Sequence, residues 1–245
     1  MVLNGVFNDA FYMSFLICVL HYILEADSKM VRIICVLIGY VFGLFQTAYI
    51  YGRCKGIDIR KEGSGNAGTT NTLRVLGTKA GMIVLFGDII KTMAAILVVK
   101  LLFKNAYPVT IDILILYTAA GAILGHNYPF YLNFKGGKGI AATAGLILSL
   151  HPYFIITGVV LFFGAFFTTH YVSLGSLLVY AGFVIQLVFL GQNGFFVGMT
   201  QANLFEMYGI ALFLAVMAYW RHRENIKKLL HGTERKTYLF KKKEA

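Results

Sequence analysis

Hydrophobic residues gather into eight runs along the chain, and short polar connections separate each run from the next. Most runs are near the roughly 20 residues that a helix needs to cross a bilayer. The run at 139–150 is short for a span, which leaves a tilted or a re-entrant segment open. The pattern predicts an all-α, polytopic bundle of transmembrane helices. The eight runs are 6–25, 31–52, 81–102, 111–125, 139–150, 153–168, 172–190 and 203–220.

The composition also indicates a membrane protein. Of the 245 residues, 58% are hydrophobic and 13% are charged, and the mean hydropathy is +0.71. A soluble domain of this length could not bury so much apolar surface, whereas a bilayer accepts it. No small-residue cleavage site follows the run at 6–25, so we interpret it as a retained helix rather than a signal peptide. The chain shows no internal repeat and no linker, which indicates one membrane domain.

Basic residues are distributed unevenly along the chain. If the eight runs alternate in direction, the polar stretches 53–80, 126–138 and 221–245 lie on one side of the membrane. They hold six, two and nine Lys and Arg residues, which is 17 of the 22. Cytoplasmic loops attract Lys and Arg, so these stretches are predicted to face the cytoplasm. The formal net charge of +11 suits anionic lipids or anionic substrates, and topology alone could also explain it.

The first polar stretch contains the sequence GSGNAGTTNTLR, in which glycines alternate with small hydrogen-bonding residues. Such glycines let the backbone turn freely, and its N–H groups can then form a nest for an oxyanion. Arg74 adds a planar cation suited to phosphate or carboxylate. The alternative is a turn-rich connector whose Asn and Thr side chains bond to the local backbone. The candidate binding residues are Ser64, Gly65, Asn66, Gly68, Thr70, Asn71 and Arg74.

The second polar stretch contains KGGKG, in which Lys135 and Lys138 bracket two glycines just before an apolar run. A helix N-terminus with free N–H groups and nearby lysines is a favourable position for phosphate. Gly–Lys pairs also mark ordinary cytoplasmic helix ends, so this alternative stays open.

The third polar stretch begins RHRENIKK. His222 and Asn225 are three residues apart, so on a continued helix they share a face. His222 is a candidate acid or base near neutral pH, and a structural role at a helix end is the alternative. The neighbouring cations, Arg221 among them, can equally be the basic flank of a membrane helix.

Two charged residues, Asp88 and Lys91, lie within the third apolar run. Their i, i+3 spacing allows them to pair, and the cost of charge in a bilayer predicts that they face the protein interior or the cytoplasmic mouth. A structural ion pair and support of a functional site are both open. The cysteines lack metal-ligand spacing and the carboxylates are sparse, so no metal site is predicted.

The three polar stretches, in this order, resemble the bacterial acyl-phosphate:glycerol-3-phosphate acyltransferase family. The similarity extends from about residue 38 to residue 236. Its motifs are GSGNAGTTNTLRVLG, GHNYPFYLNFKGGKGIA and RHRENIKKLLHGTE, with smaller matches at DIIK and YVSLGS. Two departures stand out: residues 1–30 have no counterpart in the shortest family members, and Ala142 stands where the family usually has threonine. In addition, Thr69 replaces a commoner alanine.

The resemblance implies about seven core spanning helices in a membrane-embedded acyltransferase domain at 31–245, with one extra N-terminal transmembrane helix at 1–30. It implies an enzyme of the bacterial plasma (inner) membrane that transfers an acyl group from acyl-phosphate to the 1-hydroxyl of glycerol-3-phosphate. The products are lysophosphatidic acid and phosphate. An acyl-carrier-protein:phosphate acyltransferase is the expected functional partner, and neither a cofactor nor nucleic acid is expected.

The resemblance also implies roles for residues in the matched motifs. The expected catalytic residues are His222, Asn225, Ser64 and Lys138. The expected substrate-binding residues are Gly65, Asn66, Gly68, Thr70, Asn71, Arg74, His126, Lys135, Gly136, Gly137, Gly139, Ser173 and Arg221. Acyl-phosphate has a good leaving group, so no covalent enzyme nucleophile is required. Either His222 or a substrate phosphate can accept the proton, and we favour an orienting role for His222.

Two alternatives belong to other classes. Soluble-domain glycerophosphate acyltransferases use a His-x4-Asp dyad, and none of the six histidines is followed by an acidic residue at that spacing. A membrane transporter or channel for a phosphorylated small solute would also show intramembrane charge and a basic, glycine-rich vestibule. A carrier needs access from both sides, whereas the polar stretches here gather on one side.

Overall fold

The computed structural model describes residues 28–238, and the run at 6–25 and most of the expected extra helix lie outside them. The described residues form α-helices joined by short loops, and the all-α prediction is confirmed. The long helices are α2 (Ser28–Gly43), α5 (Thr78–Phe103), α6 (Ile111–Asn127), α7 (Ile140–Leu150), α8 (Pro152–Thr169), α9 (Val172–Gln192) and α10 (Gln201–Arg221). The short helices are α3 (Thr47–Cys54), α4 (Thr69–Leu76) and α11 (Arg223–Leu230), with single 3-10 turns at Ile59–Lys61 and Phe130–Leu132.

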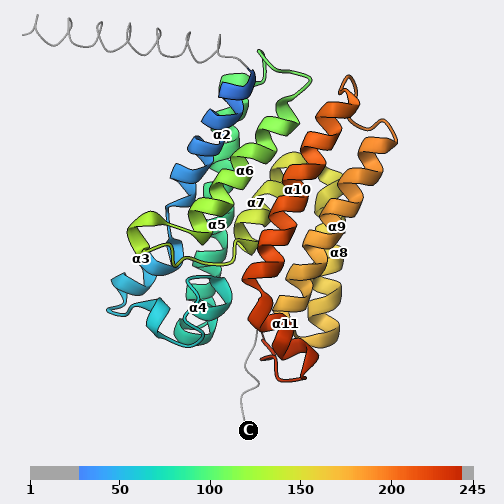
Figure 1. The fold of residues 1–245 in the computed structure, drawn as a ribbon. Coiled ribbons are helices and arrows are strands. Elements are labelled where there is room, and N and C mark those ends of the chain that lie inside the picture. The colour runs from blue at the N-terminus through green and yellow to red at the C-terminus, as the bar shows by residue number, and fades with distance from the viewer. Residues whose placement is uncertain (1–27, 239–245) are drawn as a thin grey trace, which may run out of the picture.

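The long helices form a bundle in two groups. Figure 1 shows α2, α5 and α6 on one side and α8, α9 and α10 on the other, with α7 between them. Helix α7 packs against α5, α6 and α8, and α10 packs against both α6 and α9. The short helices α3, α4 and α11 lie together at one end of the bundle. The three polar stretches are therefore brought to the same end, as their alternation predicts.

The expected helix at 31–52 is interrupted. It consists of α2 and α3, and Leu44, Phe45 and Gln46 lie between them. The Gln46 amide nitrogen donates to the carbonyls of Gly43, Gly125 and His126, each at 3.1 Å. This buried side chain satisfies carbonyl groups near the break, including two at the end of α6, so a change of chain direction is tolerated.

Helix α7 is much shorter than the segments that are long enough to cross a membrane. Within residues 28–238, five segments are long and apolar enough to cross a membrane: Ser28–Cys54, Thr78–Phe103, Pro152–Thr169, Val172–Gln192 and Gln201–Arg221. Helix α7 has 11 residues, which corresponds to about 16 Å against the roughly 30 Å of a hydrocarbon core. Helix α7 is therefore too short to cross a hydrocarbon core by itself.

Helices α2 and α6 pack backbone against backbone through reciprocal Gly-x3-Gly pairs, which the sequence analysis did not identify. A Cβ at Gly39 would lie 1.9 Å from the carbonyl oxygen of Thr118, and one at Gly121 would lie 2.1 Å from that of Val36. No side chain fits at such distances, so glycine is required at both positions. Small residues at this spacing are a common way for membrane helices to approach closely.

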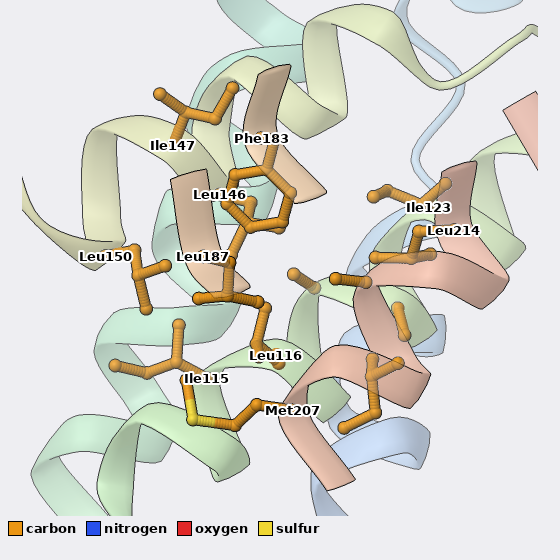
Figure 2. Close-up of a cluster of buried hydrophobic side chains, with 14 of the residues drawn as sticks. Ile115, Leu116, Ile123, Leu146, Ile147, Leu150, Phe183, Leu187, Met207 and Leu214 are labelled. Atoms are coloured by element: carbon orange, nitrogen blue, oxygen red, sulfur yellow. The ribbon is translucent and has the colours of Figure 1, made fainter. Parts of the chain in front are cut away.

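The hydrophobic core lies between α6, α7, α9 and α10 (Figure 2). Large side chains such as Leu116, Leu146, Leu187 and Met207 are fully buried there. Since lipid already surrounds the bundle with hydrocarbon, close packing rather than transfer from water holds these helices together. The core fixes α7 between the two groups, and with it the polar loop at 128–139 that precedes α7.

Candidate active site

A cavity of about 480 Å³ opens at the polar end of the bundle. Its polar part is lined by residues from all three polar stretches, and its apolar part extends along α7 between α5 and α8. The sequence-predicted residues that line it are Ser64, Asn66, Gly68, Thr70, Asn71, Arg74, His126, Lys138, Gly139, Ser173, His222 and Asn225. A single cavity thus combines a polar part, which holds hydrogen-bond donors and cations, with an apolar part along α7, which we call the apolar arm.

Asn71 organises the glycine-rich loop. Its side-chain amide nitrogen donates to the carbonyls of Ile59 and Glu62 at 3.0 and 2.9 Å, and its oxygen accepts from the Ser64 backbone N–H at 2.8 Å. Gly63 has a positive φ of 61°, and a Cβ there would lie 2.4 Å from the Asn71 oxygen, so the turn requires glycine. The loop therefore holds Ser64 at the cavity with a fixed backbone.

Two helix N-termini point toward the cavity. Helix α4 begins after Gly68 and α7 begins after Gly139, and no side chain caps either of them. Both glycines line the cavity, together with Thr69 and Ile140, the first residues of the two helices. Uncapped N–H groups and the positive end of each helix dipole favour anions. The site therefore offers two anion-binding positions built from backbone.

Arg74 lies on α4 at the rim of the cavity. One of its terminal nitrogens donates to the carbonyl of Arg235 at 3.1 Å and to the Thr237 hydroxyl at 2.7 Å. Burial lowers the pKa of Arg74 from its usual range, although the guanidinium stays protonated. The C-terminal segment is thus joined to α4 across the mouth of the cavity.

Lys138 joins the second and third polar stretches. Its ammonium donates to the side-chain oxygen of Asn225, whose amide nitrogen donates to Glu234 at 2.8 Å. The same Glu234 oxygen accepts from the Ser173 hydroxyl at 3.0 Å. Burial lowers the pKa of Lys138 to about 8, although the Glu234 carboxylate acts in the opposite direction. Lys138 is therefore a cation at neutral pH and loses its proton at moderately alkaline pH.

His222 lies between α10 and α11 and is 3% exposed. Its Nδ1 is 2.8 Å from the carbonyl oxygen of Ala218. A carbonyl only accepts, so Nδ1 carries the hydrogen and Nε2 carries the lone pair. Burial, with a further contribution from Lys138, lowers the pKa of His222 to about 4. The imidazole is therefore neutral at physiological pH and is a hydrogen-bond acceptor at Nε2.

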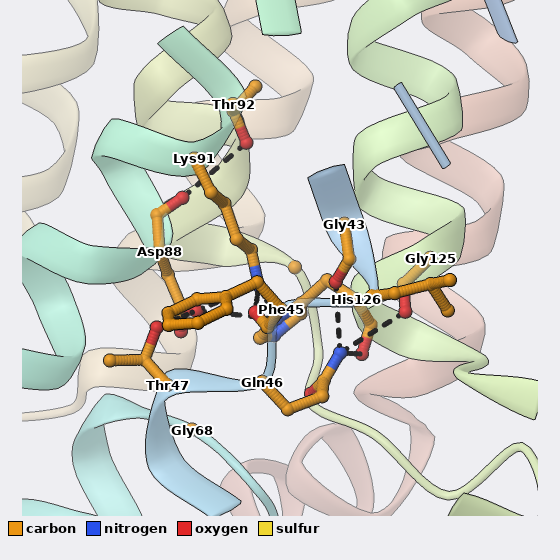
Figure 3. Close-up of polar contacts among 12 residues, drawn as sticks. Gly43, Phe45, Gln46, Thr47, Gly68, Asp88, Lys91, Thr92, Gly125 and His126 are labelled. Carbon is orange, nitrogen blue, oxygen red and sulfur yellow. Dashed lines mark hydrogen bonds and ion pairs between the residues drawn. The ribbon is translucent and has the colours of Figure 1, made fainter. Parts of the chain in front are cut away.

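Asp88 and Lys91 on α5 form a buried network with His126 on α6 (Figure 3). The Lys91 ammonium contacts Asp88 Oδ1 at 2.8 Å, the Phe45 carbonyl at 2.7 Å and His126 Nδ1 at 2.9 Å. Thr47 also donates to Asp88 at 3.0 Å. All three donors of the ammonium are used, so Nδ1 of His126 accepts. Asp88 and Lys91 form an ion pair, and Asp88 and His126 also line the cavity.

Some sequence-predicted residues do not line the cavity: Gly65, Lys135, Gly136, Gly137 and Arg221. Arg221 donates to the carbonyls of Gly136 and Gly137 at 3.1 and 2.6 Å and lies over the ring of Tyr128 at 5.2 Å. A Cβ at Gly137 would lie 2.1 Å from His126 Nε2. Arg221, Gly136 and Gly137 therefore hold the loop that carries Lys138.

Sequence reasoning missed Glu234 as a site residue. It lies at the end of the third motif, and it accepts hydrogen bonds from two expected site residues. Its place in the motif was the signal that could have identified it. Within residues 28–238, no group of three or more His, Cys, Asp or Glu side chains has a metal-binding arrangement.

Fold and site together define a multi-pass integral membrane protein whose polar cavity suits anions and continues into an apolar arm. Residues 33–232 match the family of glycerol-3-phosphate acyltransferases. The chain is 35% identical over 204 residues to the glycerol-3-phosphate acyltransferase of Geobacter sulfurreducens, covering 83% of this chain and 96% of that one. It is 40% identical over 210 residues to that of Halalkalibacterium halodurans, with coverages of 84% and 95%.

Solved structures agree with these relatives. The glycerol 3-phosphate form of PlsY, an integral membrane glycerol 3-phosphate acyltransferase, superposes with a TM-score of 0.71 at 29% identity. The alignment covers 84% of this chain and 96% of PlsY. The lysophosphatidic acid form of PlsY gives a TM-score of 0.69 at 28% identity, with coverages of 85% and 96%. The chain belongs to the glycerol-3-phosphate acyltransferase family, and the predicted enzyme class is confirmed.

Proposed function

We propose that the protein transfers an acyl group from acyl-phosphate to the 1-hydroxyl of glycerol-3-phosphate, giving lysophosphatidic acid and inorganic phosphate. The observation that carries this proposal is the meeting of two uncapped helix N-termini with an apolar arm in one cavity. Both substrates carry phosphate, and the donor also carries a hydrocarbon chain. PlsY structures exist in glycerol 3-phosphate and lysophosphatidic acid forms, which supports the same acceptor and product here.

The chemistry needs positioning more than activation. The attacking hydroxyl forms a new C–O bond at the acyl carbon, and the C–O bond to phosphate breaks with phosphate as leaving group. Arg74, Lys138 and the two helix N-termini offset repulsion between the phosphates. A base whose pKa is about 4 accepts protons weakly near neutral pH. His222 therefore orients the hydroxyl through Nε2, and a substrate phosphate accepts the proton.

A direct transfer leaves no acyl group on the protein. The test is mass spectrometry of the purified protein after incubation with acyl-phosphate and without acceptor. An unmodified mass is expected, and Ser64→Ala should weaken turnover without abolishing it because the backbone donors remain. An acyl adduct on Ser64 or on the exposed Cys54 would refute direct transfer.

We also propose that the protein lies in a bacterial plasma (inner) membrane with the polar end of the bundle in the cytoplasm. An acyl-carrier-protein:phosphate acyltransferase would supply its donor from that side. The Lys and Arg bias of the three polar stretches supports this orientation. Cysteine labelling tests it in a background without the native cysteines. Labelling from the cytoplasmic side is expected at Glu62→Cys, Asn133→Cys and Lys236→Cys, and from outside at the control Asn193→Cys.

The deciding experiment for the activity is an assay of the purified protein in detergent. Glycerol-3-phosphate is supplied with acyl-phosphate, acyl-coenzyme A or acyl-carrier protein, and lysophosphatidic acid is quantified. Product from acyl-phosphate alone is the expected result, and a preference for either thioester would refute the proposed donor. A carrier of phosphorylated solutes would instead move glycerol-3-phosphate across vesicles without forming product.

A further inference from the structure

The apolar arm of the cavity has a definite direction. It lies along α7 between α5 and α8, both of which pack against α7. The arm starts beside Lys138 and passes Ile147, which lies about 10 Å along the helix axis from Ile140, the first residue of α7. Helix α8 runs antiparallel to α7, so Phe162 lies toward the chemistry and Ile155 toward the far end. An acyl chain bound by its phosphate would follow this direction.

The α8 wall of the arm has a gap at Gly158. Ile155, Gly158 and Phe162 all line the cavity, and their spacing places them on one face of the helix. Two of the three carry large side chains and the middle one carries none. A Cβ at Gly158 would lie 3.6 Å from both Cδ1 and Cγ2 of Ile147. A methyl group fits there in ordinary contact, and any larger side chain must extend into the arm.

Helix packing does not require this glycine. At Gly175 on α9, a Cβ would lie 2.9 Å from the backbone carbonyl oxygen of Phe162 on α8, so packing limits that position. At Gly158 no contact is that close, and alanine favours a helix over glycine. What the glycine does provide is open width in the arm, at the level where Leu148 and Val159, which also line the cavity, are 43% and 49% exposed.

We propose that Gly158 is a specificity-determining position, which keeps the far end of the arm open so that long acyl chains pass Ile147 and reach the lipid. This inference rests on the proposed acyl transfer and adds the residue that sets the accepted chain length. An extended octanoyl chain ends before the level of Ile147, whereas a hexadecanoyl chain continues beyond it. Only the longer chain needs the gap.

The test compares two donors on each variant. Octanoyl-phosphate and hexadecanoyl-phosphate are assayed with glycerol-3-phosphate, and the ratio of kcat/KM for the long donor over the short donor is measured. Gly158→Leu should lower this ratio roughly tenfold or more, since several methylene groups lose their binding surface. Gly164→Leu is the matched control, because Gly164 lies on the same helix outside the cavity with open space around its Cβ. Its ratio should equal that of the unaltered protein.

A second variant introduces the obstruction after folding. Gly158→Cys, in a background without the native cysteines, is modified with a short or a long alkyl methanethiosulfonate, and Gly164→Cys serves as its control. The ratio should fall with the length of the alkyl group at position 158 and stay constant at position 164. An unchanged ratio in the modified cysteine variant would overturn the proposal even if Gly158→Leu fails to fold.

The experiments distinguish a failure of the proposed acyl donor from a failure of the role assigned to Gly158. If the unaltered protein uses acyl-coenzyme A rather than acyl-phosphate, the proposed donor is wrong, and the same ratio is then measured with octanoyl- and hexadecanoyl-coenzyme A. If the unaltered protein uses acyl-phosphate and the Gly158 variants keep its ratio, only the assignment of Gly158 is wrong.

Discussion

The pH dependence of Lys138 gives the most direct test of the site. Burial lowers the pKa of this residue from 10.5 to about 8, and the shift corresponds to about 3 kcal/mol of unfavourable environment for the charged form. The cation is present below pH 8 and is lost as pH rises through that value. We therefore expect kcat/KM for glycerol-3-phosphate to fall roughly tenfold between pH 7 and pH 9. The second ionisation of a phosphate monoester, near pH 6, lies outside this window.

Two measurements separate this effect from others. The unfolded chain keeps the lysine proton up to its ordinary pKa, so unfolded protein binds more protons between pH 8 and 10 and the Lys138 contribution makes stability rise there. Between pH 8 and pH 10, activity should therefore fall while the midpoint temperature of thermal unfolding in detergent does not. Lys138→Arg should be less active, because a planar guanidinium replaces a point charge. Its activity should also not show the alkaline limb, which is the fall of kcat/KM between pH 7 and pH 9, because arginine keeps its proton in this range. An alkaline limb that persists in Lys138→Arg, or a flat profile in the unaltered protein, would refute the assignment.

Three further predictions concern packing, anion geometry and the N-terminal segment. Gly121→Leu should separate α2 from α6 and abolish folded protein in detergent chromatography, whereas Gly209→Leu should be tolerated because a Cβ there meets open space. Arg74→Lys keeps the charge but loses the paired N–H donors of the guanidinium. The loss of one charged hydrogen bond, about 1.5–3 kcal/mol, predicts at least tenfold lower kcat/KM. Deletion of residues 1–28, which lie outside the family match, should leave appreciable activity in a correctly inserted protein.

The sequence predicted the helices well because apolar runs and basic flanks depend on local composition. The run at 172–190 corresponds to Val172–Gln192 and that at 203–220 to Gln201–Arg221. The break in the run at 31–52 was missed, since it involves hydrogen bonds from Gln46 to carbonyls at the end of α6. Such a contact joins residues far apart in sequence and leaves no local pattern.

The site was predicted less completely for the same reason. The motifs indicate which side chains gather, and the cavity lining includes Lys138, His222 and Asn225 from two distant stretches. They do not indicate which way each side chain points. Arg221 donates to backbone carbonyls of the second stretch and does not line the cavity. Glu234 is distant from Ser173 in sequence, and only the folded segment brings the two side chains together.

The negative charges near Lys138, of which the Glu234 carboxylate is one, couple the binding of substrate to the protonation of this lysine. The Glu234 carboxylate accepts from Asn225 and Ser173 and partly offsets the cost of burying Lys138 as a cation. A bound phosphate adds negative charge beside Lys138, and a nearby anion raises the pKa of a lysine. The pH dependence of kcat/KM reports the pKa of Lys138 in the free enzyme, and that of kcat reports its pKa in the enzyme–substrate complex. The fall of kcat at alkaline pH should therefore occur at higher pH than the fall of kcat/KM. Limbs at the same pH would show that the bound phosphates lie away from Lys138.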